Sequence, residues 1–146
     1  MVFRRYCNLQ SHRPTNGWKI SVWEIKVPLQ SGPPSHYYHT NLEEGFYVLE
    51  GEFSFQYNEN VVNATAGSFI HVQRGIIHTY KNVSKNISRL LVTGLPAGFE
   101  SFIEQLGVPI TDEEFQSSFS TPKIERIVEV AKKNGIIFVP DLKSKS

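Results

Sequence analysis

Apolar and polar residues alternate in short runs along the first two thirds of the chain, a pattern typical of β-strands. Residues 52–57 show it most clearly, because Phe53, Phe55 and Tyr57 share one face and polar residues take the other. Runs of this kind, separated by Gly, Pro and Asn turns, recur between residues 18 and 94. Many short strands at nearly even spacing predict an antiparallel sandwich or barrel, in which closure hides the sheet edges.

After Gly94 the period of the apolar residues changes from two to nearly four, which predicts helices. One helical face is formed by Phe99, Phe102, Ile103 and Leu106. Thr111 has the spacing of a helix-opening capping box, and Thr121 followed by Pro122 predicts the start of a last helix. The apolar stripe of that last helix is expected to consist of Ile124, Ile127, Val128 and Ala131.

The length and composition of the chain are those of one globular domain with a helical tail. Its 146 residues are 40% hydrophobic and 20% charged, close to the average of folded domains. We expect an N-terminal arm over residues 1–17, a β-barrel over 18–94 and a C-terminal extension over 95–146 with two or three short helices. The predicted fold class is therefore all-β with a helical C-terminal tail.

Charge and cysteine content exclude several classes of partner. Fifteen Lys and Arg residues stand against fourteen Asp and Glu, a net charge of +1, so nothing attracts the chain to nucleic acid or to an acidic membrane surface. No apolar run approaches the roughly eighteen residues of a membrane span. The first residues contain no apolar stretch of a secretory signal, and Cys7 is a single cysteine, so we expect a cytoplasmic protein.

Potential metal ligands gather in two segments rich in turn residues. The first segment, residues 32–51, contains His36, Tyr37, His39 and Glu44. The second segment, residues 67–82, contains His78. His39, Glu44 and His78 supply two imidazoles and one carboxylate, the ligand set of the facial triad in non-haem iron proteins, which leaves positions open for substrate and oxygen. These residue types make a metal centre the leading hypothesis for the site.

The two segments resemble the two sequence motifs of the cupin superfamily. As in the first motif, four residues separate His39 from Glu44 and six separate Glu44 from Gly51. The second motif matches with every gap intact at Gly67, Gly75, His78 and Asn82, and Gln73 stands where the motif has Pro. The resemblance implies a jelly-roll β-barrel, or double-stranded β-helix, over about residues 18–94. The helical tail is also similar to that of single-domain bacterial cupins described as quercetin dioxygenase-like.

In the cupin superfamily, two His and one Glu of the first motif and one His of the second hold one divalent metal inside the barrel. The resemblance implies that His39, Glu44 and His78 bind Fe, Mn, Ni or Zn, and that Glu44 also serves as a catalytic base. The remaining motif histidine is expected where this chain has Tyr37, and His36 stands one place earlier. Alternate residues of a strand face opposite sides, so His36 can reach the metal only if a bulge or a turn redirects it. We therefore expect Tyr37 nearest the fourth ligand position.

The other inward positions of the predicted strands are mostly aromatic and predict the walls of a pocket for a small organic ligand. The residues expected to line it are Tyr37, Phe46, Val48, Phe53, Phe55 and Tyr80. His71 lies out of register with Ile70 and Val72, so we expect its side chain to face outward. No cluster of Arg is placed to bind a phosphate or a diacid, and the substrate is not indicated.

Three functions stay open at this point, because the fold alone does not choose among them. The first is a small metal-dependent enzyme with a dioxygenase-like, lyase or isomerase activity on a small organic substrate. The second is a metal-free sensor or carrier of a small molecule, which Tyr37 in place of His favours. The third is a non-catalytic assembly protein. Single-domain relatives commonly dimerise, so the resemblance also implies a homodimer.

Overall fold

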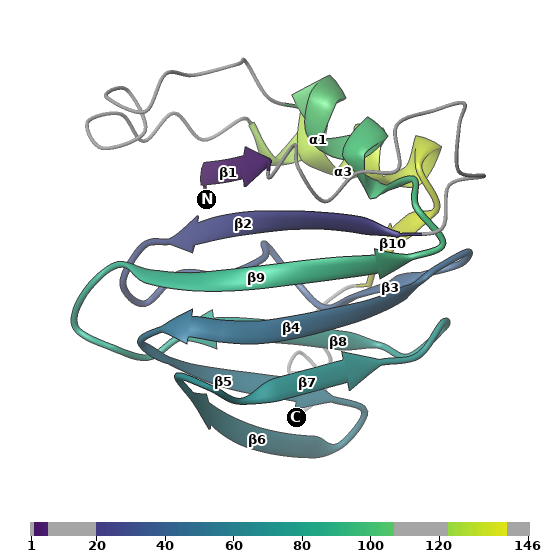
Figure 1. Ribbon diagram of the computed structural model, residues 1–146. Helices are drawn as coiled ribbons and strands as arrows, with labels where there is room; N and C mark the ends of the chain where they lie inside the picture. The colour runs from purple at the N-terminus through teal and green to yellow at the C-terminus, as the bar shows by residue number, and fades with distance from the viewer. Residues whose placement is uncertain (1, 6–19, 107–122, 140–146) are drawn as a thin grey trace, which may run out of the picture.

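Within the described residues, the chain forms two antiparallel sheets of five strands each, which pack face to face (Figure 1). The computed structural model describes residues 2–5, 20–106 and 123–139. The first sheet has the order β1 (Val2–Arg5), β2 (Ser21–Val27), β9 (Ser88–Leu95), β4 (Glu43–Glu50) and β7 (Phe69–Val72). The second sheet has the order β10 (Ile136–Phe138), β3 (Tyr37–His39), β8 (His78–Asn82), β5 (Glu52–Tyr57) and β6 (Asn60–Thr65). This arrangement confirms the predicted jelly-roll barrel.

Alternate residues of the strands fill the space between the two sheets and form the core. In β9, Leu90 and Val92 are fully buried, and the residues between and beside them, Arg89, Leu91 and Thr93, are partly exposed. Phe46 of β4 reaches across to the second sheet, where its ring centroid lies 5.2 Å from that of Phe55 and 5.3 Å from that of Tyr80. The alternation seen in the sequence thus decides which side chains face the barrel interior.

A buried polar network around Asn82 joins the ends of β2, β8 and β9. The Asn82 side chain is fully buried, and its Nδ2 donates to the carbonyl oxygens of Val27 at 3.0 Å and Asn86 at 2.8 Å. Its Oδ1 accepts from the Ser84 and Ser88 hydroxyls at 2.7 and 3.0 Å. Asn82, the last residue of the second motif, therefore fastens three strands together.

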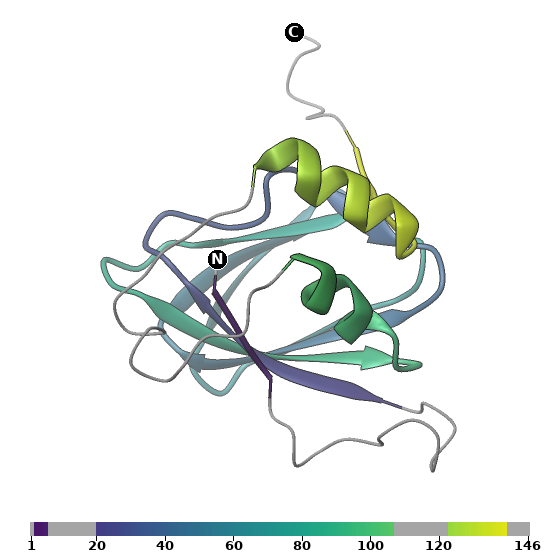
Figure 2. The same cartoon turned by 90° about the horizontal axis from the view of Figure 1, so that it is seen from above.

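Two described helices, α1 (Phe99–Leu106) and α3 (Ile124–Lys133), lie side by side against one side of the barrel (Figures 1 and 2). Helix α1 follows β9 directly and buries Phe99 and Phe102, as the sequence predicts. Neither of these helices is long and apolar enough to cross a membrane.

The predicted apolar stripe of α3 is wrong in part. Ile124 and Val128 are 60% and 40% exposed, whereas Val130 and Ala131 are buried. Strand β10 follows α3 after the turn at Gly135 and pairs with β3. This pairing holds the last turns of α3 against the barrel, so the buried face lies there and the first turn projects outward.

Two further expectations need correction. Residues 2–5 form β1, which pairs antiparallel with β2, whereas the sequence predicts an arm separate from the barrel; pairing gives the edge of β2 a hydrogen-bonded neighbour. The C-terminal extension is not wholly helical, because the β-branched and aromatic run Ile136–Phe138 forms β10. The helix start expected at Thr111 and the single cysteine Cys7 lie outside the described residues.

Candidate metal centre

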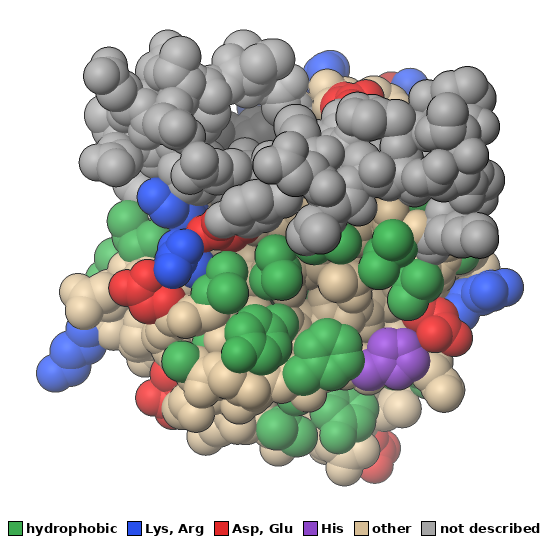
Figure 3. Space-filling view, viewed as in Figure 1, with side chains coloured by type: hydrophobic (Ala, Val, Ile, Leu, Met, Phe, Trp, Pro, Cys, Tyr) green, Lys and Arg blue, Asp and Glu red, His purple; other side chains and the backbone are tan. Residues whose placement is uncertain are grey.

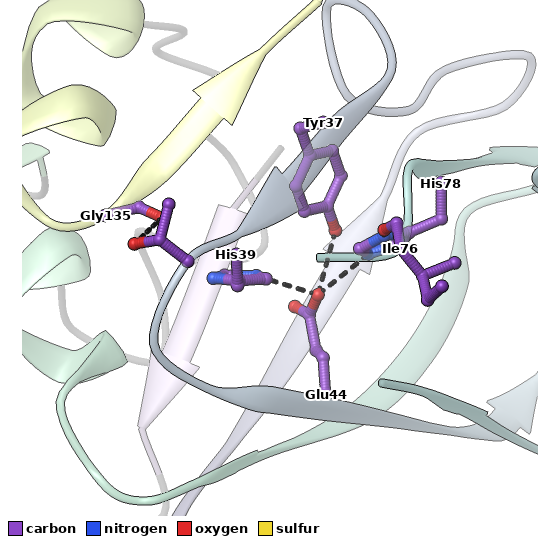
Figure 4. Close-up of polar contacts among 7 residues, drawn as sticks. Tyr37, His39, Glu44, Ile76, His78 and Gly135 are labelled. Carbon is purple, nitrogen blue, oxygen red and sulfur yellow. Dashed lines mark hydrogen bonds and ion pairs between the residues drawn. The ribbon is translucent and has the colours of Figure 1, made fainter. Parts of the chain in front are cut away.

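Strands from both sheets place four polar side chains together in the barrel interior (Figure 4). Tyr37 and His39 lie two residues apart on β3, so both face inward. His78 begins β8 and its Cα pairs with that of Tyr37. Glu44 comes from β4 of the opposite sheet. Each of the four residues is at most 7% exposed, so the cluster is closed off from bulk water and spans the two sheets.

The other three side chains all converge on one carboxylate oxygen of Glu44. His39 Nε2 lies 2.9 Å from Glu44 Oε2, and His78 Nε2 lies 3.0 Å from the same atom. The Tyr37 hydroxyl donates to this oxygen at 3.3 Å. Figure 4 shows these three contacts as dashed lines that meet at the carboxylate. The residues matched to the cupin motifs are therefore neighbours in space.

The side chain that reaches Glu44 from the start of β3 is that of Tyr37. His36 precedes the first residue of the strand, and its carbonyl oxygen accepts a hydrogen bond from the backbone N–H of Val139 at 2.8 Å. The Tyr37 hydroxyl donates to Glu44 Oε2, and the Nε2 atoms of His39 and His78 lie 2.9 and 3.0 Å from the same oxygen. The geometry therefore follows the alternation of the strand, without a bulge that turns His36 towards the carboxylate.

The electrostatics of the cluster keep Glu44 charged and Tyr37 neutral. Burial raises the pKa of the Glu44 carboxyl, but the charges and hydrogen bonds of His39 and His78 outweigh it and lower this pKa to about 2. Burial, followed by the Glu44 charge, raises the pKa of the Tyr37 hydroxyl well above its ordinary value. The same two causes raise the pKa of Tyr80. At neutral pH the cluster holds one carboxylate and a phenol that can only donate to it.

The orientation of His78 suits a metal ligand. Its Nδ1 lies 2.8 Å from the carbonyl oxygen of Ile76, which can only accept, so Nδ1 carries a proton. In neutral His78 the lone pair of Nε2 therefore faces the Glu44 carboxylate, and two acceptors meet. This contact becomes favourable when a proton or a metal cation lies between them. A backbone carbonyl that fixes the tautomer in this way is the usual outer partner of a metal-bound histidine.

Among the described residues, His39 has no such outer partner. Its Nδ1 is buried and makes no hydrogen bond with the described part of the chain. In the present arrangement His39 donates from Nε2 to Glu44. Across residues 2–5, 20–106 and 123–139, no three His, Cys, Asp or Glu side chains have the spacing of a preformed metal site. The ligand candidates contact one another, and a cation would have to separate them.

The cluster is bordered by the ring of Phe99, which the sequence does not assign to the site, and Trp23 packs behind that ring. The Phe99 ring of α1 packs edge-on against His39 at a centroid distance of 5.6 Å. Trp23 of β2 stacks on Phe99 at 4.4 Å. The alternation of β2 could have indicated that Trp23 faces inward, but only the chain topology brings Phe99 to it.

The six residues expected to line a pocket are all at most 7% exposed. Tyr37 belongs to the polar cluster, and the aromatic rings of Phe53, Phe55 and Tyr80 pack against one another in the core. A role for the six as pocket walls stays a prediction. His71 is half exposed, as expected, and its Nε2 lies 3.1 Å from Glu43 Oε2 on the outer face of the first sheet.

Comparisons with known proteins agree with this architecture. The profile of the cupin domain family matches residues 23–94. Quercetin 2,3-dioxygenase from Bacillus subtilis (strain 168) is 28% identical over 127 residues, which cover 82% of this chain and 36% of that protein. The structure of KdgF from Halomonas sp. superposes with a TM-score of 0.52 at 13% identity, over 54% of this chain and 70% of that one. TT1209 from Thermus thermophilus gives 0.51 at 20% identity, over 55% and 75%.

The two sheets and the profile match define a cupin domain, and the chain belongs to the cupin superfamily. At these low identities the two solved structures support the fold alone. The chain spans 36% of the length of the Bacillus dioxygenase, so that protein's activity enters here only as a proposal.

Proposed function

We propose that the chain is a metal-dependent cupin in which His39, Glu44 and His78 bind a divalent cation next to a small organic substrate. The observation that carries this proposal is the orientation of His78, whose Nδ1 is committed to Ile76 while its Nε2 faces the Glu44 carboxylate. The donor set of two imidazoles and one carboxylate is chemically suited to Fe, Mn, Ni or Zn.

The residues of the chain have separate tasks in this proposal. The bound cation would supply a Lewis acid with positions open to a substrate oxygen and, in a dioxygenase, to O₂. His39 and His78 hold Glu44 ionised, which makes it a strong ligand and a weak base. When Glu44 turns away from the imidazoles its basicity rises, and it can then accept a substrate proton. Tyr37 keeps its proton and donates a hydrogen bond within the cluster.

The relative that carries a dioxygenase name favours oxygenase chemistry over the lyase and isomerase alternatives. Burial of the cluster also favours a reaction that has to exclude water. A dioxygenase-like activity on a small organic compound is thus the function that we propose.

Metal titration of chelator-treated protein tests the proposal. Zn²⁺, Ni²⁺, Mn²⁺ and, without oxygen, Fe²⁺ are titrated by calorimetry into wild type, His78→Ala and His71→Ala. We expect His78→Ala to lose at least about a hundredfold in affinity, because one of three strong ligands is gone. His71→Ala is the matched control, since this exposed His contacts Glu43 outside the barrel. Equal affinity of wild type and His78→Ala would refute the proposed centre.

A metal-free binder is the second candidate. The contacts of Tyr37 and His39 with Glu44 favour it, because the hydrogen bonds that they donate stabilise the carboxylate without a cation. A protein that takes up none of the four cations but binds a small organic molecule would support this alternative.

We also propose that the chain forms a homodimer through the outer face of the first sheet. Hydrophobic side chains gather over β4, β7 and β9 on this face (Figure 3). Phe69 and Tyr47 pair across β7 and β4 and are 58% and 39% exposed. We expect a dimeric mass in analytical ultracentrifugation and a monomeric mass for Phe69→Glu. A monomeric wild type at micromolar concentrations would contradict the dimer.

A further inference from the structure

The strand that carries Tyr37 and His39 is supported mainly by the C-terminal strand β10. On one side of β3, within the described residues, Tyr37 pairs with His78 of β8, and the Gly75 N–H donates to the His39 carbonyl oxygen at 2.9 Å. On the other side, every residue of β10 has a partner in β3: Ile136 with His39, Ile137 with Tyr38 and Phe138 with Tyr37. Most of the strand pairing of β3 therefore comes from β10.

Hydrogen bonds beyond both ends of β10 extend this pairing. The Gly135 carbonyl oxygen accepts from the backbone N–H of Thr40 at 2.8 Å and from the Thr40 hydroxyl at 3.1 Å (Figure 4). The Val139 N–H donates to the carbonyl oxygen of His36 at 2.8 Å. Thr40 directly follows β3 and His36 directly precedes it. The backbone on both sides of β3 is thus fixed to the C-terminal tail, which here means α3 and β10.

Two side chains of β10 lie next to the polar cluster. Ile136 is 2% exposed and is the register partner of His39. Paired residues of antiparallel strands point to the same side of the sheet, so the Ile136 side chain lies beside the imidazole. The ring centroid of Phe138 lies 5.7 Å from that of Tyr37. A shift of β10 would therefore reach the cluster through side chains as well as through the backbone.

The His39 imidazole depends on this support more than the His78 imidazole does. The Nδ1 atom of His78 is oriented by the carbonyl oxygen of Ile76. The Nδ1 atom of His39 is buried without a hydrogen bond to any described residue. An outer hydrogen bond usually fixes the ring of a metal-bound histidine. For His39, the packing and the backbone of β3 have to do this instead.

Gly135 allows the tail to approach the end of β3 closely. Its φ is +77°, in the left-handed region that favours glycine. A Cβ built on Gly135 would lie 2.7 Å from Thr40 Oγ1 and 2.9 Å from Asn41 Oδ1. A larger residue therefore has to move the turn away from β3 or displace the Thr40 hydroxyl from its hydrogen bond.

We propose that the C-terminal tail positions the metal centre, because β10 fixes the place of His39 relative to its partners in the cluster. Gly135 and Ile136 are the positioning residues. This inference rests on the proposed function and adds a part of the chain that the family domain does not contain. The cupin profile matches residues 23–94, and β10 lies outside this range.

The variants Gly135→Val and Gly67→Val test the inference as a matched pair. Gly67 has a φ of +91°, so valine is strained by the backbone at both positions. A Cβ built on Gly67 would meet no atom within 4 Å. We expect the affinity of chelator-treated protein for Zn²⁺, measured by calorimetry, to fall about tenfold in Gly135→Val. Gly67→Val should keep the wild-type affinity, although urea unfolding should show a loss of stability in both variants.

The imidazole ¹⁵N signals of metal-free protein supply a readout that a general loss of stability does not move. The signals missing from His39→Asn are those of His39. We expect Gly135→Val to shift the Nε2 signal of His39, because its contact with the carboxylate changes. The His78 signals should stay in place, since the Ile76 carbonyl still orients that ring. Gly67→Val should leave the signals of both histidines unchanged.

A second pair of variants, Ile136→Ala and Ile137→Ala, replaces the glycine pair if Gly135→Val does not fold. Successive residues of a strand face opposite sides, so Ile137 points away from the interior that Ile136 faces. Both truncations keep the backbone of β10. We expect the tenfold loss of zinc affinity and the shift of the His39 signal in Ile136→Ala alone. The conservative variant Ile136→Val should restore the wild-type values.

Equal zinc affinity of Gly135→Val and wild type, or equal losses in the two variants of a pair, would overturn the inference and leave the proposed function standing. Equal shifts of the His39 and His78 signals would also overturn it, because the tail would then act on the whole barrel. Absence of zinc binding by the wild type overturns the proposed function. The metal-free protein then tests the inference by itself: a His39 shift in Gly135→Val without one in Gly67→Val supports it, and any other result contradicts it.

Discussion

The barrel holds two buried polar networks, one around Asn82 and one around Glu44, and they differ in how far they satisfy themselves. Asn82 uses both atoms of its amide on partners supplied by the chain, among them the carbonyls of Val27 and Asn86 and the hydroxyls of Ser84 and Ser88. In the Glu44 network, His39 Nδ1 has no partner among the described residues and His78 Nε2 faces a carboxylate. Asn82 ends the second motif, and the Glu44 network draws its residues from both motifs.

The difference separates a structural role from a functional one. A polar network whose hydrogen bonds are all satisfied by the chain rigidifies the fold and needs no ligand. A network that leaves lone pairs and a carboxylate facing one another gains when a cation enters. The comparison therefore assigns Asn82 to the stability of the barrel and Glu44 to its chemistry.

Asn82→Ala should have the largest effect on stability. The substitution removes hydrogen bonds from the amide and leaves the buried Val27 carbonyl and the Ser88 hydroxyl with fewer partners. We expect the free energy of unfolding to fall by about 4 kcal/mol, at roughly 1 kcal/mol for each bond. Urea unfolding measures this loss. Metal affinity of the folded variant should equal that of wild type, and a loss of affinity would mean that the two networks are coupled.

Protonation of Glu44 at low pH should lower the free energy of unfolding. The pKa of this carboxyl is about 2 in the folded chain against an ordinary 4.5, so the unfolded state binds more protons between these values. Stability gained from Glu44 is then fully present above pH 4.5 and is lost as the pH falls towards 2, by about 3 kcal/mol. Urea unfolding at a series of pH values measures the slope.

The variants Glu44→Gln and Asn82→Ala show which of the two networks causes the pH dependence of stability. The amide side chain introduced by Glu44→Gln cannot be protonated, so this variant should reduce the decline in unfolding free energy between pH 4.5 and 2. Asn82→Ala should have a lower unfolding free energy at every pH and the same decline as wild type. If Glu44→Gln declines as steeply as wild type, other carboxyl groups cause the acid sensitivity and the pKa assigned to Glu44 is wrong.

Tyr37→Phe should have the smallest effect. It removes a single hydrogen bond of 3.3 Å to Glu44 and keeps the ring that packs on His78 at a centroid distance of 4.3 Å. We expect a loss of about 1 kcal/mol in unfolding free energy and less than a tenfold change in zinc affinity. A loss as large as that of His78→Ala would show that the Tyr37 oxygen is itself a metal ligand.

The sequence predicts the barrel and the convergence of its candidate ligands because both follow from local patterns. Strand alternation places Tyr37 and His39 on one face, and the motif spacing selects Glu44 and His78. The sequence does not predict which face of α3 is buried, because the pairing of β10 with β3 decides how the helix packs. The apolar residues Ile124 and Val128 have the right spacing for a buried stripe, yet β10 holds a different part of α3 against the barrel.

The sequence also does not predict that Trp23 and Phe99 stack beside the site. Trp23 and Phe99 are 76 positions apart, and nothing local indicates that they stack. Their contact depends on β2 and β9 being neighbours in the first sheet and on α1 following β9 without a long connection. Similarly, the hydrogen bond from His78 Nδ1 to Ile76 depends on the backbone path before β8.

Histidine ¹⁵N NMR of chelator-treated protein, recorded before and after one equivalent of Zn²⁺, tests the central claim most directly. The claim is that His78 keeps its Nδ1 proton on Ile76 and offers Nε2 to a metal. We expect the Nε2 signals of His39 and His78 to move to the metal-bound range, while the His78 Nδ1 proton stays in place and His71 does not change. Unchanged His39 and His78 signals, or a response confined to His71, would contradict the assignment of a metal centre to this cluster.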